Sequence, residues 1–226
     1  MKLVLASQGF TNDKIADEVS KLVGKKLEDI NIAIINEAYV AISGTASKRW
    51  LIDELGNIAK YIGGNIDFVN FRAYDKEEIK NRLMYADLIY IVGGKQLILP
   101  KLFNATETLE LLKKIAEKKV IMGTSAGSVV LGSQIQSKDY WKERYGLNLD
   151  EIENEGLNLI NINIIPHYLR EDHKKWDENF FERVLKDNPF PVYAIQDSQA
   201  VIYNSGDIYV VGGNARIFGN NKNALD

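Results

Sequence analysis

The first two thirds of the chain alternate short, nearly continuous apolar runs with longer segments whose apolar residues recur every three to four positions. The apolar runs predict buried strands, because parallel strands covered on both faces are rich in Val, Ile and Leu throughout. They comprise residues 3–6, 32–35, 66–69, 88–92 and 120–122. The alternation predicts an α/β fold with three layers, in which helices cover both faces of a mostly parallel sheet.

Polar residues and glycines between these runs predict where the helices begin and end. Asn12 or Thr11 can cap a helix that stops at Gly24. Thr45 can cap a second helix, which the glycine pair beginning at Gly63 would end. The apolar stripe of this second helix consists of Trp50, Leu51, Leu55, Ile58 and Ile62.

Two further helix starts follow from the spacing of a capping box, with Asp or Asn in place of the usual Ser or Thr. Asp75 lies three residues before Glu78, and Asn104 lies three residues before Glu107. We therefore expect one helix to begin after Asp75 and another after Asn104.

The last third of the chain has a different pattern. Residues 159–165 predict another strand and residues 175–186 a helix, and three apolar runs then follow at 192–196, 199–203 and 208–211. The last two are too close for a crossover helix, and the turn residues 204–207 between them predict an antiparallel hairpin. Residues 133–156 are polar, aromatic and weakly periodic, which indicates an excursion over the site. No repeat or linker divides the chain, so one domain over residues 1–226 is the simplest interpretation.

The run Gly123-Thr124-Ser125-Ala126-Gly127 carries the candidate chemistry. It follows an apolar strand and precedes the start of a helix, which is the context that a G-x-S-x-G nucleophile elbow requires. Small flanking residues let the strained turn fit between strand and helix, and the helix N-terminus can stabilise an oxyanion. The same pattern also occurs in plain turns, whereas the glycine patterns of phosphate-binding loops are absent.

A serine nucleophile needs a base, and the chain has two histidines. His167 directly follows a predicted buried strand, so we expect it at the same carboxyl edge as Ser125. His173 lies in a charged stretch that is typical of solvated surface. His167 is therefore the candidate base.

The remaining members of the site are an acid and the oxyanion donors. Asp197 follows a later strand and can orient the base, and Asp139, shortly after the elbow helix, is the rival acid. Gly94, after the preceding strand, can bring its N–H group close to a substrate. We expect the Gly94 and Ala126 N–H groups to form the oxyanion hole.

Composition narrows the function classes. The chain has 226 residues, 46% hydrophobic and 26% charged, with a net charge of −3. This charge gives no reason to expect nucleic acid as a partner. The absence of cysteine excludes disulfides and cysteine nucleophiles and fits a cytoplasmic protein. We expect no membrane segment, no metal cluster and no cofactor.

The elbow, the Gly93-Gly94 turn one strand earlier and Pro166-His167 after it, in this order, resemble the dipeptidase E and cyanophycinase family of serine peptidases. The resemblance covers essentially the whole chain. It implies an α/β fold related to class I glutamine amidotransferases, with Ser125 as nucleophile and His167 as base. For the acid it implies either Asp197, at a position where the family usually has Glu, or Asp139, which matches an acid proposed shortly after the nucleophile.

The resemblance further suggests which residues bind substrate. The family turn usually continues with Asn or Asp after its two glycines, whereas this chain has Lys95, which borders the pocket. Dipeptidase E cleaves dipeptides with an N-terminal aspartate, and Arg170 is the nearby candidate for reading such a carboxylate.

These observations predict a serine peptidase that acts on small peptides by acyl transfer through Ser125, His167 and Asp197. Two alternatives stay open. The same residues can serve a different hydrolase, an esterase or amidase, or the elbow can be retained in a binding protein without catalysis. The sequence leaves open whether the chain is a monomer or a homodimer.

Overall fold

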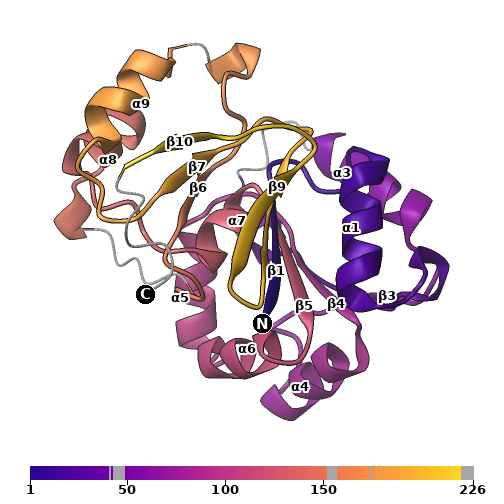
Figure 1. Cartoon of the computed structure of the whole chain (residues 1–226). Helices are drawn as coiled ribbons and strands as arrows, with labels where there is room; N and C mark the ends of the chain where they lie inside the picture. Colours follow the sequence, from indigo (N-terminus) through magenta and orange to yellow (C-terminus); the bar gives the residue numbers. More distant parts are fainter. Residues whose placement is uncertain (41, 43–48, 152–156, 174, 220–226) are drawn as a thin grey trace.

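A seven-stranded sheet forms the centre of the molecule, with strand order β3-β2-β4-β5-β1-β8-β9 (Figure 1). The computed structural model describes residues 1–40, 42, 49–151, 157–173 and 175–219. Strands β1 to β5 are mutually parallel, and β8 and β9 are antiparallel. The strands are β1 (Lys2–Ala6), β2 (Ile32–Ile35), β3 (Ile66–Phe68), β4 (Leu88–Ile91), β5 (Val120–Thr124), β8 (Ala200–Asn204) and β9 (Asp207–Val211). The five early strands and the final hairpin were predicted from the sequence and are confirmed, but β3 is not buried as predicted: it lies at the edge of the sheet, where Ile66 and Phe68 are exposed.

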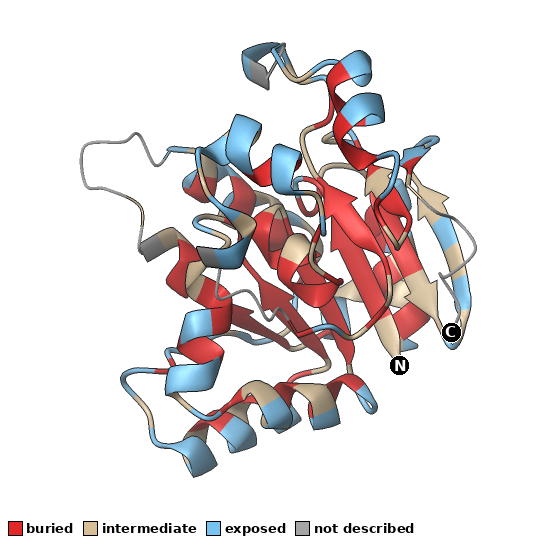
Figure 2. Cartoon of the chain, turned by 90° about the vertical axis from the view of Figure 1, so that its left-hand side faces the viewer, coloured by how far each residue is buried: buried red, intermediate tan, exposed pale blue. Residues whose placement is uncertain are grey.

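Helices cover both faces of this sheet, which confirms the three-layer α/β prediction. Alternate residues of β1 show the arrangement, because Leu3 and Leu5 face one core cluster and Val4 and Ala6 face the other. Figure 2 shows the buried strands between helices whose outer faces are exposed. The first cluster packs against α4 (Lys76–Tyr85), α5 (Ile98–Ala105), α6 (Leu109–Ala116) and α7 (Ala126–Leu131), and the second against α1 (Asp13–Val23) and α3 (Arg49–Tyr61).

Two of the predicted helix caps are present. Asn12 accepts a hydrogen bond from the Ile15 N–H at the start of α1, and Gly24 ends that helix with a φ of 78°. Asp75 accepts from the Glu78 N–H at the start of α4. The predicted cap at Thr45 lies outside the described residues.

The predicted helix start at Asn104 is wrong. Asn104 lies within α5, which continues to Ala105, and the next helix begins only after Thr108. Glu107 has a φ of 53°, so it does not continue a right-handed helix. The apolar face of α5, with Leu102 and Phe103 buried, decides where the helix lies and outweighs the local capping pattern.

A second, three-stranded sheet was not predicted. Its order is β10-β7-β6, with β6 and β7 parallel. It packs with α8 and α9 around a third core cluster, on the side of the molecule away from α1 and α3 (Figure 1). These elements are β6 (Asn163–Ile165), β7 (Val192–Ala194), β10 (Arg216–Phe218), α8 (Lys138–Tyr145) and α9 (Glu178–Leu185).

This second sheet corrects the prediction that residues 133–156 only pass over the site. The segment includes α8, from which Tyr140 and Trp141 are buried in the third cluster. The predicted strand over residues 159–165 is confirmed only in its last three residues, which form β6. The remaining short elements are α2 (Glu37–Val40) and the 3₁₀ helices at Leu27–Asp29, Leu149–Glu151 and Glu171–His173. Within the described part of the chain, no helix has the length and apolar character that a bilayer crossing requires.

Candidate active site

Ser125 occupies a sharp turn between β5 and α7. Its φ of 51° and ψ of −115° lie outside the regions that most residues adopt, and Ser125 is half-buried. The turn is tight enough that a Cβ on Gly123 would lie 2.4 Å from the Gly127 carbonyl carbon. A Cβ on Gly127 would lie 2.0 Å from the Ile91 carbonyl oxygen. The two glycines therefore allow this strained turn to form, as the sequence pattern predicts.

The structure brings His167 and Asp197 to this serine. His167 Nε2 lies 3.0 Å from Ser125 Oγ, and His167 Nδ1 lies 2.5 Å from Asp197 Oδ1. His167 follows β6 and Asp197 follows β7, so the histidine and the acid come from the smaller sheet and the serine from the larger one. This corrects the expectation that His167 lies at the same sheet edge as Ser125. The three side chains nevertheless form a continuous hydrogen-bond chain.

Ser7, which sequence reasoning missed, links the Ser125–His167–Asp197 hydrogen-bond chain to the main sheet. It follows β1, is fully buried, and donates from Oγ to Asp197 Oδ1 at 2.9 Å. Ser7 Oγ also accepts a hydrogen bond from the His167 backbone N–H at 2.8 Å. Ser7 thus positions both partners, including His167 in its unusual backbone conformation with a φ of 58°. Its place directly after a buried strand, like that of Ser125, was the available signal.

Arg170 lies beside the acid but is already engaged. Its Nε and Nη2 donate to the two carboxylate oxygens of Asp172 at 2.7 and 3.0 Å. Its Nη1 lies 3.1 Å from His167 Nδ1 and 3.9 Å from Asp197 Oδ2. Because the Nδ1–H of His167 donates to Asp197 at the shorter distance, Arg170 acts here as a nearby positive charge.

The surroundings of Asp197 favour its ionised form. Burial alone would raise the pKa of Asp197, but hydrogen bonds from His167 and Ser7 and the charge of Arg170 outweigh it and hold this pKa below its ordinary value. An ionised acid at this position fixes the tautomer of His167 with Nε2 free to accept the proton of Ser125. The arrangement thus suits His167 to general-base chemistry.

The two predicted oxyanion donors, Gly94 and Ala126, lie at the cavity that contains Ser125. Gly94 and Ala126 both line a cavity with Ser125, and neither backbone N–H donates to an acceptor among the described residues. Gly94 has a φ of 139°, and a Cβ there would lie 2.3 Å from the Ala38 carbonyl oxygen. At Gly93 a Cβ would lie 2.9 Å from Ser125 Cβ. Gly93 thus lets the turn after β4 approach the serine closely, and Gly94 lets the same turn pass close to Ala38.

The other residues singled out in the sequence lie outside the hydrogen-bond chain of Ser125, His167 and Asp197. Asp139 is exposed in the first turn of α8, and no hydrogen bond or ion pair joins it to His167 in the described structure. Lys95 is exposed at the rim of the cavity that contains Ser125. His173 ends the 3₁₀ helix that begins at Glu171. Among the described residues, no group of three or more His, Cys, Asp or Glu side chains could hold a metal ion.

Two cavities meet at Ser125 and His167. The first, which we call the aromatic cavity, has a volume of about 440 Å³ and lies under α8. Its wall includes Leu97, Val129, Tyr140, Trp141, Arg144 and Tyr145. The second, which we call the polar cavity, has a volume of about 500 Å³, and its wall includes Ser7, Gln8, Trp50, Glu54, Arg170 and Asp172.

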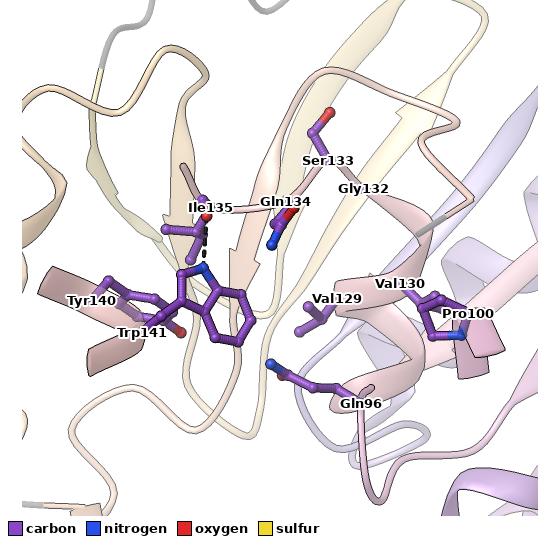
Figure 3. Close-up of a pocket in the computed structure, with 10 residues that line it drawn as sticks. All are labelled: Gln96, Pro100, Val129, Val130, Gly132, Ser133, Gln134, Ile135, Tyr140 and Trp141. Carbon is purple, nitrogen blue, oxygen red and sulfur yellow. Dashed lines mark hydrogen bonds between the residues drawn. The ribbon is translucent and has the colours of Figure 1, made fainter. Parts of the chain in front are cut away.

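A small cavity of about 20 Å³ adjoins the aromatic cavity and shares part of its wall (Figure 3). In that view the indole of Trp141 faces Val129, and its N–H donates to the Ile135 carbonyl oxygen at 2.8 Å. This bond fixes the ring in the wall of the aromatic cavity.

A strained serine at a strand-to-helix turn, bonded to a histidine and an acid on a three-layer α/β fold, defines a serine hydrolase type of site. The family model for peptidase family S51 matches residues 3–215, and the chain belongs to this family. The predicted family resemblance is thereby confirmed, and the chain is a peptidase.

Individual relatives agree with this membership. An uncharacterized peptidase of Pasteurella multocida (strain Pm70) is 26% identical over 179 residues, which is 75% of this chain and 83% of that protein. The crystal structure of a candidate peptidase E protein from Listeria monocytogenes EGD-e has a TM-score of 0.70 at 18% identity, over 94% of this chain and 98% of that one. A peptidase from an acI-B1 Actinobacterium has a TM-score of 0.64 at 20% identity, over 96% and 93%. The two structures share the fold.

Proposed function

We propose that this chain is a serine peptidase that hydrolyses small peptides, dipeptides among them, with Ser125 as nucleophile, His167 as base and Asp197 as the acid. The observation that carries the proposal is the hydrogen-bond chain from Ser125 Oγ through the imidazole to Asp197. Membership of peptidase family S51 supports peptide bonds as the target.

The reaction is an acyl transfer in two halves. His167 Nε2 takes the proton of Ser125 as its oxygen attacks the peptide carbonyl carbon, and the Gly94 and Ala126 N–H groups stabilise the oxyanion. The imidazolium, stabilised by Asp197, then protonates the leaving amine as the C–N bond breaks. Water, deprotonated by the same histidine, attacks the acyl-enzyme, which releases the carboxylic acid product and the free serine.

The dimensions of the site support a short substrate. The aromatic and polar cavities, of about 440 and 500 Å³, each have the volume of a small-molecule site, and both reach Ser125. Lys95 at the rim of the aromatic cavity and Arg170 in the polar cavity remain our sequence-based predictions for substrate contacts.

A fluorophosphonate tests the nucleophile directly, because an activated serine oxygen displaces fluoride from phosphorus, so the chain gains the mass of the probe less that of the HF released. We expect stoichiometric labelling of the native chain at Ser125 by intact mass and peptide mapping. His167→Ala should slow the labelling roughly 100-fold or more, because the serine loses its base. Asp197→Asn should slow it strongly, since the histidine loses the acid that fixes its tautomer.

Asp139→Asn is the matched control and should label at the native rate, because Asp139 is exposed and has no bond to His167. A library of dipeptides then separates peptidase from esterase chemistry. Labelling without hydrolysis of any peptide would contradict the peptidase assignment. A well-folded chain that resists the probe would contradict the nucleophile itself.

A further inference from the structure

Arg144 on α8 is a charged side chain without an acidic partner. It is half-buried in the wall of the aromatic cavity, and no carboxylate pairs with it in the part of the chain that the structure describes. Among the described residues, it donates one hydrogen bond, from Nη1 to Tyr140 Oη at a long 3.3 Å. A guanidinium has several N–H donors in a planar fork, so most of them are left for another acceptor.

Aromatic rings hold this guanidinium in place. Its central carbon lies 5.5 Å from the ring centres of Tyr140, Tyr145 and Phe181. Such contacts partly compensate a desolvated cation but do not satisfy its N–H groups. Burying a charge in this way is costly unless a counter-charge arrives. The position of Arg144 is therefore that of a preformed receptor for an anion.

The charges around the aromatic cavity also favour the binding of an anion. Lys95 and Arg144 both line it, together with Ser125 and His167, and none of the described residues that line it carries a carboxylate. The polar cavity on the other side of Ser125 differs, because Glu54 and two residues already paired with each other, Arg170 and Asp172, line it. Among the described residues that line the two cavities, the cations that are not already paired with a carboxylate are in the aromatic one.

We propose that Arg144 determines specificity by binding a carboxylate of the substrate in the aromatic cavity, within reach of Ser125. This proposal rests on the function proposed above and adds a recognition residue to it. Two carboxylates have the required chemistry: the C-terminal carboxylate of the leaving residue and an acidic side chain of the acyl residue. In both cases the planar guanidinium donates two parallel N–H hydrogen bonds, one to each carboxylate oxygen.

Matched peptides distinguish these two sources. Alanyl-leucine and alanyl-leucinamide differ only in the terminal carboxylate, and aspartyl-leucinamide and asparaginyl-leucinamide only in the side-chain carboxylate. Binding of all four is measured by calorimetry on Ser125→Ala, which cannot turn them over. In one of the two pairs we expect the carboxylate member to bind roughly 10- to 100-fold more tightly, as a charge-assisted hydrogen-bonded pair warrants. The pair that shows the preference identifies the source.

Arg144→Met keeps the apolar stem and removes the fork, so it should abolish the preference while the amide member binds unchanged. Arg144→Lys keeps the charge without the fork and should leave a smaller preference. Arg183→Met is the matched control, because Arg183 is exposed, pairs with Glu143 and lies outside both cavities. It should retain the full preference.

In the Ser125→Ala variant, with Arg144 unchanged, equal affinities within both pairs or no binding of any peptide would overturn the proposal. A full preference in Arg144→Met would do the same. Should Arg144→Met not fold, Arg144→Lys decides, since an undiminished preference there excludes bidentate binding. Failure of the proposed function has a different signature, namely a native chain that the fluorophosphonate does not label.

Discussion

At the scale of single residues, the site depends on a side chain that does not react. Ser7 Oγ bridges Asp197 Oδ1 and the His167 backbone N–H, at 2.9 and 2.8 Å. It thus couples strand β1 of the large sheet to the two residues contributed by the small sheet. We regard Ser7 as a positioning residue, because its contacts are with the histidine and its acid.

Replacing Ser7 by Ala should lower kcat roughly 10- to 100-fold, because a hydrogen bond to a charged acid is lost and the His167 N–H is left without its acceptor. KM for a good peptide should change little, since Ser7 holds the catalytic residues. Steady-state kinetics measure both. Ser133→Ala is the control, because Ser133 is also buried and donates to a backbone oxygen, that of Ile160, at 3.0 Å. It should lower stability and leave kcat intact, and equal kcat losses in the two variants would refute a positioning role.

A residue's role in the site could be predicted from the sequence only where its neighbours in the chain form a recognisable pattern. Ser125 has a five-residue pattern between a strand and a helix, so its place follows from the sequence. His167 could be singled out because the chain has only two histidines. Glu54 and Arg144 have no such signal, because their importance arises from what surrounds them after folding. For Glu54 the only hint was a polar residue on the apolar stripe of α3.

At the scale of elements, the close approach of α7 to β4 decides whether the serine turn can form. A Cβ added at Gly127 would lie 2.0 Å from the Ile91 carbonyl oxygen, and backbone cannot yield as a flexible side chain can. Gly127→Ala should therefore destabilise the fold by roughly 1–3 kcal/mol or more and suppress fluorophosphonate labelling. Urea unfolding and the labelling rate measure the two effects.

Gly56→Ala is the opposite control for this turn. Gly56 lies in the exposed middle of α3, and an added Cβ there meets nothing within 4 Å. Alanine should raise the free energy of unfolding by about 0.5–1 kcal/mol, because it favours the helix. If both alanine variants changed stability alike, backbone crowding would not explain the glycine at position 127.

The elements themselves were predictable where one local signal dominates. Continuous Val, Ile and Leu marked the parallel strands, and Asn12 and Asp75 marked two helix starts. At Asn104 the local cap competed with burial of Leu102 and Phe103, and burial won. The small sheet could not be predicted, because β10 has three residues, two of them exposed, and its pairing with β7 depends on distant chain.

At the scale of the whole molecule, the layered fold buries an acid between α3 and the main sheet, beside the polar cavity. Glu54 is 6% exposed and accepts a hydrogen bond from Tyr90 Oη at 2.7 Å. Burial raises the pKa of Glu54 to about 7, although the hydrogen bonds from Tyr90 and Thr124 oppose this shift. Since the ordinary value is 4.5, the folded chain holds the proton of Glu54 more tightly than the unfolded chain does.

The sign of the pH dependence follows from this difference. The raised pKa contributes stability that is fully present below pH 4.5 and is lost as the pH rises toward 7 and through it. Between pH 5 and pH 8 the loss from Glu54 should be on the order of 3 kcal/mol. Glu54→Gln keeps the acceptor for Tyr90 without an ionisable group, so its stability should fall less over this range. Urea unfolding of both chains at several pH values measures the difference.

Comparing the native chain with Glu54→Gln separates the contribution of Glu54 to the pH dependence of stability from that of the other acidic residues. Glu37 is also buried, and burial likewise raises its pKa, but it is present in both proteins and its contribution cancels. Glu28→Gln is the surface control, because Glu28 is exposed and pairs with the exposed Lys26. Its pH profile should match that of the native chain. If Glu54→Gln also matched the native profile, the carboxyl group would ionise in the folded chain as readily as in the unfolded one.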